Sequence, residues 1–148
     1  MGFYALLVLI MCFSLSEKAL HSDIDQEFTV IIAARNEEVN ILNTLNALKN
    51  QKVTPESIII VDDHSEDSTL EILKNFAVEN PEMKIIILSL ESVGKKAAWK
   101  QALAEVKTDL VLSIDADCIV GEKWTKSILD AVRENKRLIS APVLYTEN

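Results

Sequence analysis

The sequence predicts an α/β fold: a Rossmann-like, mostly parallel sheet with flanking helices, preceded by an apolar N-terminal helix. The first observation is that short runs rich in isoleucine, valine and leucine alternate with helical patterns from Phe28 onward. Such alternation is typical of βαβ units, whose right-handed crossovers place successive strands in parallel. The second observation is that these runs are continuously apolar, as expected for strands that helices cover on both faces.

Five strands are predicted from apolar runs of strand length. They occupy residues 28–34, 57–61, 83–88, the apolar start of the stretch 110–117, and residues 138–145. The fourth run ends in two acids, Asp115 and Asp117, which are expected just past the end of a buried strand, because carboxylates are rarely buried without a partner. Pro142 lacks the backbone N–H that a central strand needs, so the fifth strand is expected at an edge of the sheet.

Capping signals predict where the first two helices begin. Asn36 is expected to cap the first helix, with Glu37 and Glu38 in its first turn, where the helix dipole favours acids. Ser68 and Glu71 have the spacing of a capping box at the start of the second helix. Apolar residues then recur at helical spacing in both segments.

Two further helices are predicted from apolar spacing. The third is expected to open at Gly94 and Lys95, with Trp99, Leu103 and Val106 on one side. The fourth carries Trp124, Ile128 and Val132 on one face, and both tryptophans are expected in the core.

Composition limits the class of protein. The chain has 148 residues, of which 49% are hydrophobic and 26% charged, so it is expected to form one globular domain with a core. The formal net charge is −8 and no basic stripe is visible, which argues against nucleic acid as a partner. The two cysteines, Cys12 and Cys118, suggest neither a disulfide framework nor a zinc site.

The first 20 residues are predicted to form a hydrophobic helix. Residues 3–15 are apolar except for Ser14. This apolar run is shorter than the roughly 20 residues that a membrane span needs. Three interpretations compete: a membrane helix that is the remnant of a longer span, a signal peptide and a buried helix. A membrane anchor is favoured, with residues 21–27 as a linker and the globular domain, residues 28–148, on the cytoplasmic side.

Polar residues follow the strands at the points where these end. The first strand leads into Arg35 and Glu37, the second into Asp63, and the fourth into Asp115 and Asp117. In a doubly wound sheet, ligands bind beyond the carboxyl ends of the strands, where the strand order reverses. If the order is 3-2-1-4, the ligand is expected between the polar residues of the first and fourth strands.

The ligand predicted from these residues is a nucleoside diphosphate with a metal. Neither glycine-rich phosphate-binding motif is present, so another source of positive charge is needed. Asp115 and Asp117 offer hard oxygen ligands for Mg²⁺ or Mn²⁺, and Lys95 offers a point charge. Asp63 and Glu37 can accept hydrogen bonds from a base or a ribose. The alternative for the two aspartates is an acidic turn after a strand.

The combined motifs resemble the family 2 glycosyltransferases, which have the GT-A nucleotide-sugar-binding fold. The resemblance covers about residues 28–145 and is carried by residues 30–37, 60–69, 94–98 and 113–117, in that order. It implies a GT-A nucleotide-sugar-binding half and a nucleotide-diphosphate sugar as the ligand, with a UDP-sugar favoured.

The resemblance also implies a role for each matching residue. It implies that Ala33, Arg35 and Glu37 line the nucleotide pocket and that Asp63 contacts the base. It further implies that Lys95 lies near the nucleotide or its phosphates. By the same resemblance, Asp115 approaches the ribose and the metal, while Asp117 holds the metal on the diphosphate.

The chain departs from the family pattern near its end. The family carries a later acidic general base, and many members carry a Gln-x-x-Arg-Trp motif, whereas this sequence ends at Asn148 before either. No catalytic residue is therefore identified. Donor binding with little or no transferase activity is expected of this chain alone, because transfer needs a base to deprotonate the acceptor hydroxyl.

The motifs taken singly are also compatible with other classes of protein. Asp62-Asp63 also resembles the Mg²⁺-binding acids of receiver domains, although those lack a second acidic pair on the fourth strand. Asp115 and Asp117 resemble the motif of haloacid-dehalogenase-type phosphatases, although that motif normally follows an early strand. A third alternative is a truncated, non-catalytic remnant that only binds a nucleotide or a partner.

Several of the residues singled out above also have purely structural interpretations. These are Arg35 as an ion-pair partner, Asp62 as an acceptor for loop amides, His64 as a loop residue and Cys118 as a small buried hydrophobe.

Overall fold

The computed structural model describes residues 26–90 and 95–133 as a parallel sheet with helices on both faces. The four described strands have the order β3-β2-β1-β4, as predicted, and all three neighbouring pairs are parallel. The elements in chain order are β1 (Phe28–Ala34), α1 (Ile41–Lys49), β2 (Ser57–Asp62), α2 (Thr69–Glu79), β3 (Ile85–Ser89), α3 (Lys95–Glu105), β4 (Leu110–Asp115) and α4 (Trp124–Arg133).

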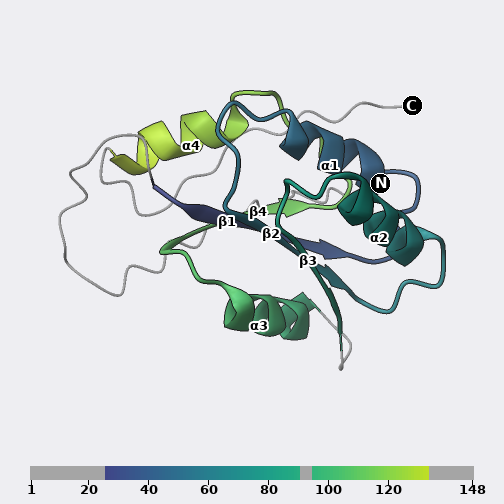
Figure 1. Ribbon diagram of the computed structural model, residues 1–148. Helices are drawn as coiled ribbons and strands as arrows, with labels where there is room; N and C mark the ends of the chain where they lie inside the picture. The colour runs from purple at the N-terminus through teal and green to yellow at the C-terminus, as the bar shows by residue number, and fades with distance from the viewer. Residues whose placement is uncertain (1–25, 91–94, 134–148) are drawn as a thin grey trace, which may run out of the picture.

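The sheet lies between two helical layers. Figure 1 shows α1, α2 and α4 on one face of the sheet and α3 on the other. Along β2, Ile58 and Ile60 join the apolar cluster under the first layer, whereas Ile59 and Val61 join the cluster under α3. Both faces of each central strand are therefore buried, which is why the strands are continuously apolar in sequence.

A buried glutamine joins α1 to α4. The side-chain amide of Gln51 donates to the carbonyl oxygens of Ala47, at 2.8 Å, and Gly121, at 2.9 Å. Its oxygen accepts a hydrogen bond from the Thr125 amide at 3.0 Å. Gln51 is only 6% exposed, so these bonds satisfy groups that water does not reach.

The beginnings of two helices differ from the prediction. Helix α1 begins at Ile41 after Asn40, so Glu37 and Glu38 precede the helix and do not form its first turn. Asn36 has a φ of 55° and bonds across to the loop after β2, which leaves it unable to cap α1. Ser68 precedes α2 as predicted but makes no side-chain capping bond.

The remaining differences concern strand ends and one helix face. The third strand covers Ile85–Ser89 and not residues 83–88, and Asp115 is still part of β4. On α3, Ala98 and Ala102 are buried in the cluster with the strand residues, whereas Leu103, predicted on the same side as Trp99, is 37% exposed. Trp99 and Val106 pack against this cluster as predicted.

Several predictions fall outside the described residues. These are the helix at 1–20, most of the linker at 21–27 and the strand at 138–145. Within the part of the chain that the structure describes, no helix has the length and hydropathy needed to cross a membrane.

Candidate functional site

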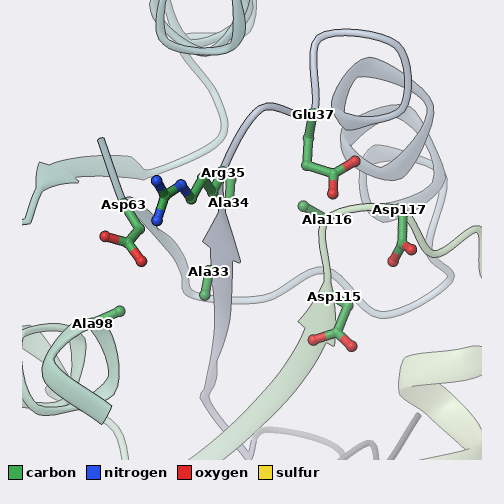
Figure 2. A pocket seen from close by; sticks show the side chains of 9 residues that line it. All are labelled: Ala33, Ala34, Arg35, Glu37, Asp63, Ala98, Asp115, Ala116 and Asp117. Atoms are coloured by element: carbon green, nitrogen blue, oxygen red, sulfur yellow. The ribbon is translucent and has the colours of Figure 1, made fainter. Parts of the chain in front are cut away.

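A pocket of about 280 Å³ lies at the carboxyl ends of the strands, between β1, β2, β4 and α3 (Figure 2). Ligands of doubly wound sheets bind at this edge, where the strand order reverses. The pocket is lined by Ala33, Ala34, Arg35, Glu37, Asp63, Ala98, Asp115, Ala116 and Asp117.

The register of the sheet explains why these residues meet. Ala33 of β1 pairs with Val61 on β2 and with Asp115 on β4. Asp63, which follows β2, and Asp115 therefore flank the end of β1 on opposite sides, as Figure 2 shows. The methyl side chain of Ala33 leaves the space between them open.

The side of the pocket next to β2 is formed by Asp63. Its backbone amide donates to the Ala34 carbonyl oxygen at 2.9 Å, which fixes the residue beside the end of β1. Its carboxylate lies 3.1 Å from Nδ1 of His64, and the Asp63 side chain is 15% exposed. His64 is exposed and does not line the pocket, so it remains a loop residue as predicted.

The loop after β1 brings Arg35 and Glu37 to the pocket. Arg35 is exposed, whereas Glu37 is half-buried and accepts a hydrogen bond from Nδ2 of Asn40 at 3.0 Å. That bond leaves the second carboxylate oxygen of Glu37 available as an acceptor. Arg35 is the only cation among the lining residues that the structure describes.

The side next to β4 is strongly acidic. Asp115 and Asp117 lie there with Ala116 between them, and Figure 2 shows their carboxylates on the side of β1 away from Asp63. With Glu37 and Asp63, the pocket has four acids and one arginine. Such an excess of carboxylates favours a cation, because a nearby positive charge relieves their mutual repulsion.

The pKa of the Cys118 thiol is raised in part by the same acidic surroundings. Burial first, and then the charge of Asp117 and a hydrogen bond to it, raise the pKa of Cys118 to about 12. Its sulfur lies 3.5 Å from Oδ1 of Asp117. The side chain is fully buried, as predicted for a small hydrophobic residue.

The donor chemistry of the two aspartates fits a divalent cation. Mg²⁺ and Mn²⁺ prefer oxygen ligands, and protein sites that also bind phosphates often supply only one or two carboxylates. Within residues 26–90 and 95–133, no three His, Cys, Asp or Glu side chains are grouped closely enough to hold a metal. Asp115 and Asp117 could therefore supply part of a coordination shell that a diphosphate completes.

The structure brings six of the seven predicted site residues into one pocket. The seventh, Lys95, begins α3, but its side chain lies outside the described residues. The assigned roles of these residues stay predictions. Ala34, Ala98 and Ala116 also line the pocket but were not predicted to do so. The only feature of the sequence that could have indicated them is that they lie within the motifs at residues 30–37, 94–98 and 113–117.

Asp62 was predicted to bond loop amides. Its side chain is 4% exposed and is not among the residues that line the pocket, and Oδ2 accepts a long bond of 3.4 Å from the Ser65 amide. Its Oδ1 has no hydrogen-bond partner within the described part of the chain.

Comparisons with known proteins place the chain in one family. The family model described as Glycosyl transferase family 2 matches residues 29–148. The poly-beta-1,6-N-acetyl-D-glucosamine synthase of Staphylococcus epidermidis is 25% identical over 125 residues, which are 84% of this chain and 30% of that protein. The chain thus spans less than a third of the length of this curated relative.

Solved structures agree with this placement. TarS 1–349 of S. aureus, crystallised with UDP, has a TM-score of 0.64 and 26% identity over 73% of this chain and 32% of that chain. The mannosyltransferase PcManGT of Pyrobaculum calidifontis, in complex with GDP-Man and Mn²⁺, has a TM-score of 0.65 and 24% identity. That match covers 72% of this chain and 31% of PcManGT, and it shows a shared fold.

Proposed function

This chain belongs to glycosyl transferase family 2, and from that premise we propose that its pocket binds a nucleotide-diphosphate sugar together with a divalent cation. The observation that carries the proposal is the convergence of Asp63, Asp115 and Asp117 from two strand ends on either side of β1. A receiver domain or a haloacid-dehalogenase-type phosphatase, the two alternatives raised by single motifs, does not account for the family match over residues 29–148.

Each side of the pocket has its own task in this proposal. Asp63 accepts a hydrogen bond from the base, and Ala33, Arg35 and Glu37 line the nucleotide. Asp115 approaches the ribose and the cation. These assignments use the acceptor capacity of ionised carboxylates, which is two oxygens each.

The diphosphate end of the ligand lies beside Asp117. Asp117 and Asp115 hold the Mg²⁺ or Mn²⁺ ion, and Lys95 is close to the phosphates. When bound, the cation supplies positive charge that helps a nucleoside diphosphate to leave. The acidic pocket itself repels a diphosphate, so binding is expected to depend on the cation.

The favoured donor is a UDP-sugar. TarS of S. aureus was crystallised with UDP and with UDP-GlcNAc, and each structure is 26% identical to this chain. The reaction proposed for the whole protein is transfer of a glycosyl group from this donor to an acceptor. The described residues contribute donor binding, and transfer by this chain alone is expected to be weak or undetectable because no general base has been identified among them.

Residues 3–15 are proposed to hold the protein at a membrane, with the pocket on the cytoplasmic side. Their apolar composition supports this proposal. Fractionation of cells that express the full chain tests it, since replacement of three leucines of this segment by lysine should move the protein from the membrane to the soluble fraction.

A calorimetric titration tests the proposed function. Wild-type protein is titrated with UDP and with GDP, each with and without Mn²⁺, alongside Asp117→Asn and Asp109→Asn. Asp109 is an exposed acid directly before β4, at the end of the strand away from the pocket, and serves as a matched control. UDP binding that requires Mn²⁺, is lost in Asp117→Asn and survives in Asp109→Asn supports the proposal. Absence of binding to either nucleotide under both conditions would contradict it.

A further inference from the structure

Two loops beside the pocket are joined by hydrogen bonds between the side chains of one and the backbone of the other. One loop follows β1 and contains residues 36–38, and the other follows β2 and contains residues 65–68 together with Thr69, the first residue of α2. We call this set of contacts the loop clasp. The first loop carries Arg35 and Glu37 to the pocket, and the second follows Asp63, so the clasp connects both sides of the nucleotide site.

Asp67 lies at the centre of the loop clasp. Its Oδ2 accepts a hydrogen bond from the Glu38 amide at 3.1 Å. Its Oδ1 accepts from the Thr69 hydroxyl at 2.6 Å, and that hydroxyl oxygen in turn accepts from the Glu37 amide at 2.8 Å. One carboxylate therefore holds two consecutive amides of the opposite loop, one directly and one through Thr69.

Other bonds of the clasp run in both directions. The Asn36 amide donates to Oγ of Ser65 at 3.0 Å, and the Glu66 amide donates to Oδ1 of Asn36 at 2.9 Å. The Ser68 amide donates to Oε2 of Glu38 at 3.0 Å. Asn36 has a φ of 55°, a conformation that asparagine tolerates better than most residues, and these bonds hold it there.

The charge of Asp67 suits this arrangement. Partial desolvation raises the pKa of Asp67. The hydrogen bonds from Thr69 and from the Glu38 amide together lower the pKa by more than desolvation raises it, so the pKa lies below the usual value of 3.8. An ionised carboxylate only accepts hydrogen bonds, and every group that Asp67 contacts here is a donor.

We propose that Asp67 is a positioning residue for the nucleotide: through the loop clasp it fixes Glu37 and Arg35 opposite Asp63. This inference rests on the proposed function, because it assumes that these residues surround a nucleoside diphosphate. A flexible first loop would have to be ordered when the ligand binds, and that ordering costs affinity. Asp67 touches no part of the nucleotide in this account.

The test combines UDP affinity in the presence of Mn²⁺ with amide hydrogen exchange of Glu37 and Glu38 measured by NMR. Asp67→Ala removes both acceptors, and Thr69→Val removes only the hydroxyl that connects Asp67 to the Glu37 amide. Thr69→Ser keeps that hydroxyl. Asp67→Ala and Thr69→Val should each weaken UDP binding about tenfold and speed exchange at Glu37, while Thr69→Ser stays within about twofold of wild type.

A control variant separates a loss of loop positioning from a general loss of stability. Leu129→Ala removes a buried side chain on α4, an element that is part of neither loop of the clasp, and it serves as the destabilised control. The inference is overturned if folded Asp67→Ala binds UDP as tightly as wild type, or if Leu129→Ala at an equal loss of thermal stability weakens UDP binding as much.

The same measurements distinguish failure of the proposed function from failure of the positioning role. If wild-type protein binds no nucleoside diphosphate, the proposed function fails and the positioning role fails with it. If wild type binds UDP and the exchange of Glu37 is unchanged in Asp67→Ala, the positioning role alone is wrong.

Discussion

The Thr44 hydroxyl donates a hydrogen bond to the carbonyl oxygen of Ala116 at 2.7 Å. Thr44 lies on α1 and is fully buried, and Ala116 separates the two aspartates of the pocket. The helix that follows β1 is thereby fixed to the loop that follows β4. The segment that carries Asp115 and Asp117 is thus held by a residue that lies 72 positions before Ala116 in the chain.

Replacement of Thr44 by valine should loosen this loop. Valine has the same shape but no donor, so the Ala116 carbonyl oxygen loses its partner and the free energy of unfolding should fall by about 1–3 kcal/mol. Mn²⁺-dependent UDP binding should weaken as well. Denaturant unfolding and calorimetry measure the two effects, and Thr44→Ser, which keeps the hydroxyl, should lie between wild type and Thr44→Val. Equal stability of Thr44→Val and wild type would show that the bond contributes nothing.

Ala33 tests whether the space at the end of β1 holds the ligand. Valine suits a strand, so Ala33→Val should change the free energy of unfolding by less than about 1.5 kcal/mol, yet its extra methyl groups enter the pocket. UDP affinity should fall about tenfold by calorimetry, on the scale of 1.4 kcal/mol per factor of ten. Ala33→Gly keeps the space open, so it should retain affinity while losing stability. If both variants bind as wild type does, the ligand lies elsewhere.

Gln51 should be a large contributor to stability outside the pocket. Gln51→Leu leaves the Gly121 carbonyl oxygen and the Thr125 amide without their partner in a buried place, so a loss of about 2–4 kcal/mol is expected in urea unfolding. Gln101 provides the comparison, because its amide donates to the Ser89 carbonyl oxygen at an exposed position. Gln101→Leu should therefore change stability by no more than about 0.5 kcal/mol. Similar losses in the two variants would contradict this assignment.

The lowered pKa of Asp67 predicts an acid-dependent contribution to stability. In the folded chain Asp67 binds a proton less readily than in the unfolded chain, where the pKa is near 3.8. Its contribution is thus fully present above that value and is lost as pH falls through the lower, folded pKa. Thermal unfolding followed by circular dichroism from about pH 6 to about pH 3 should show a shallower acid decline for Asp67→Asn than for wild type. Parallel curves would show that Asp67 titrates alike in both states.

The sequence was sufficient to predict the order of the four described strands and the edge of the sheet at which the pocket lies. The isoleucine and valine runs of β1 and β2 have the composition and length of buried parallel strands, and the polar residues follow their ends. Because parallel strands end at one edge, Asp63, Asp115 and Asp117 had to lie near one another once the strand order was 3-2-1-4.

The loops could not be predicted in the same way. Asn36 looked like a helix cap because its neighbours in sequence are acids, but its amide and side chain bond to Ser65 and Glu66 in another loop. Gln51 gave no signal at all, since its partner Thr125 lies 74 residues further along the chain. Leu103 was assigned to one side of α3 with Trp99 by its spacing, whereas the residues of this helix that are buried in the cluster with the strands are Ala98 and Ala102.

What the sequence alone determined is therefore the alternation of strands and helices, the edge at which their polar ends gather and the acidic character of the pocket. What only the tertiary structure decided is which loops hold one another, where α1 begins and which small residues leave space for a ligand. The physical reason is one of range. Apolar periodicity reflects neighbours within a few residues, whereas a loop hydrogen bond or a close helix contact depends on groups that folding brings together from distant parts of the chain.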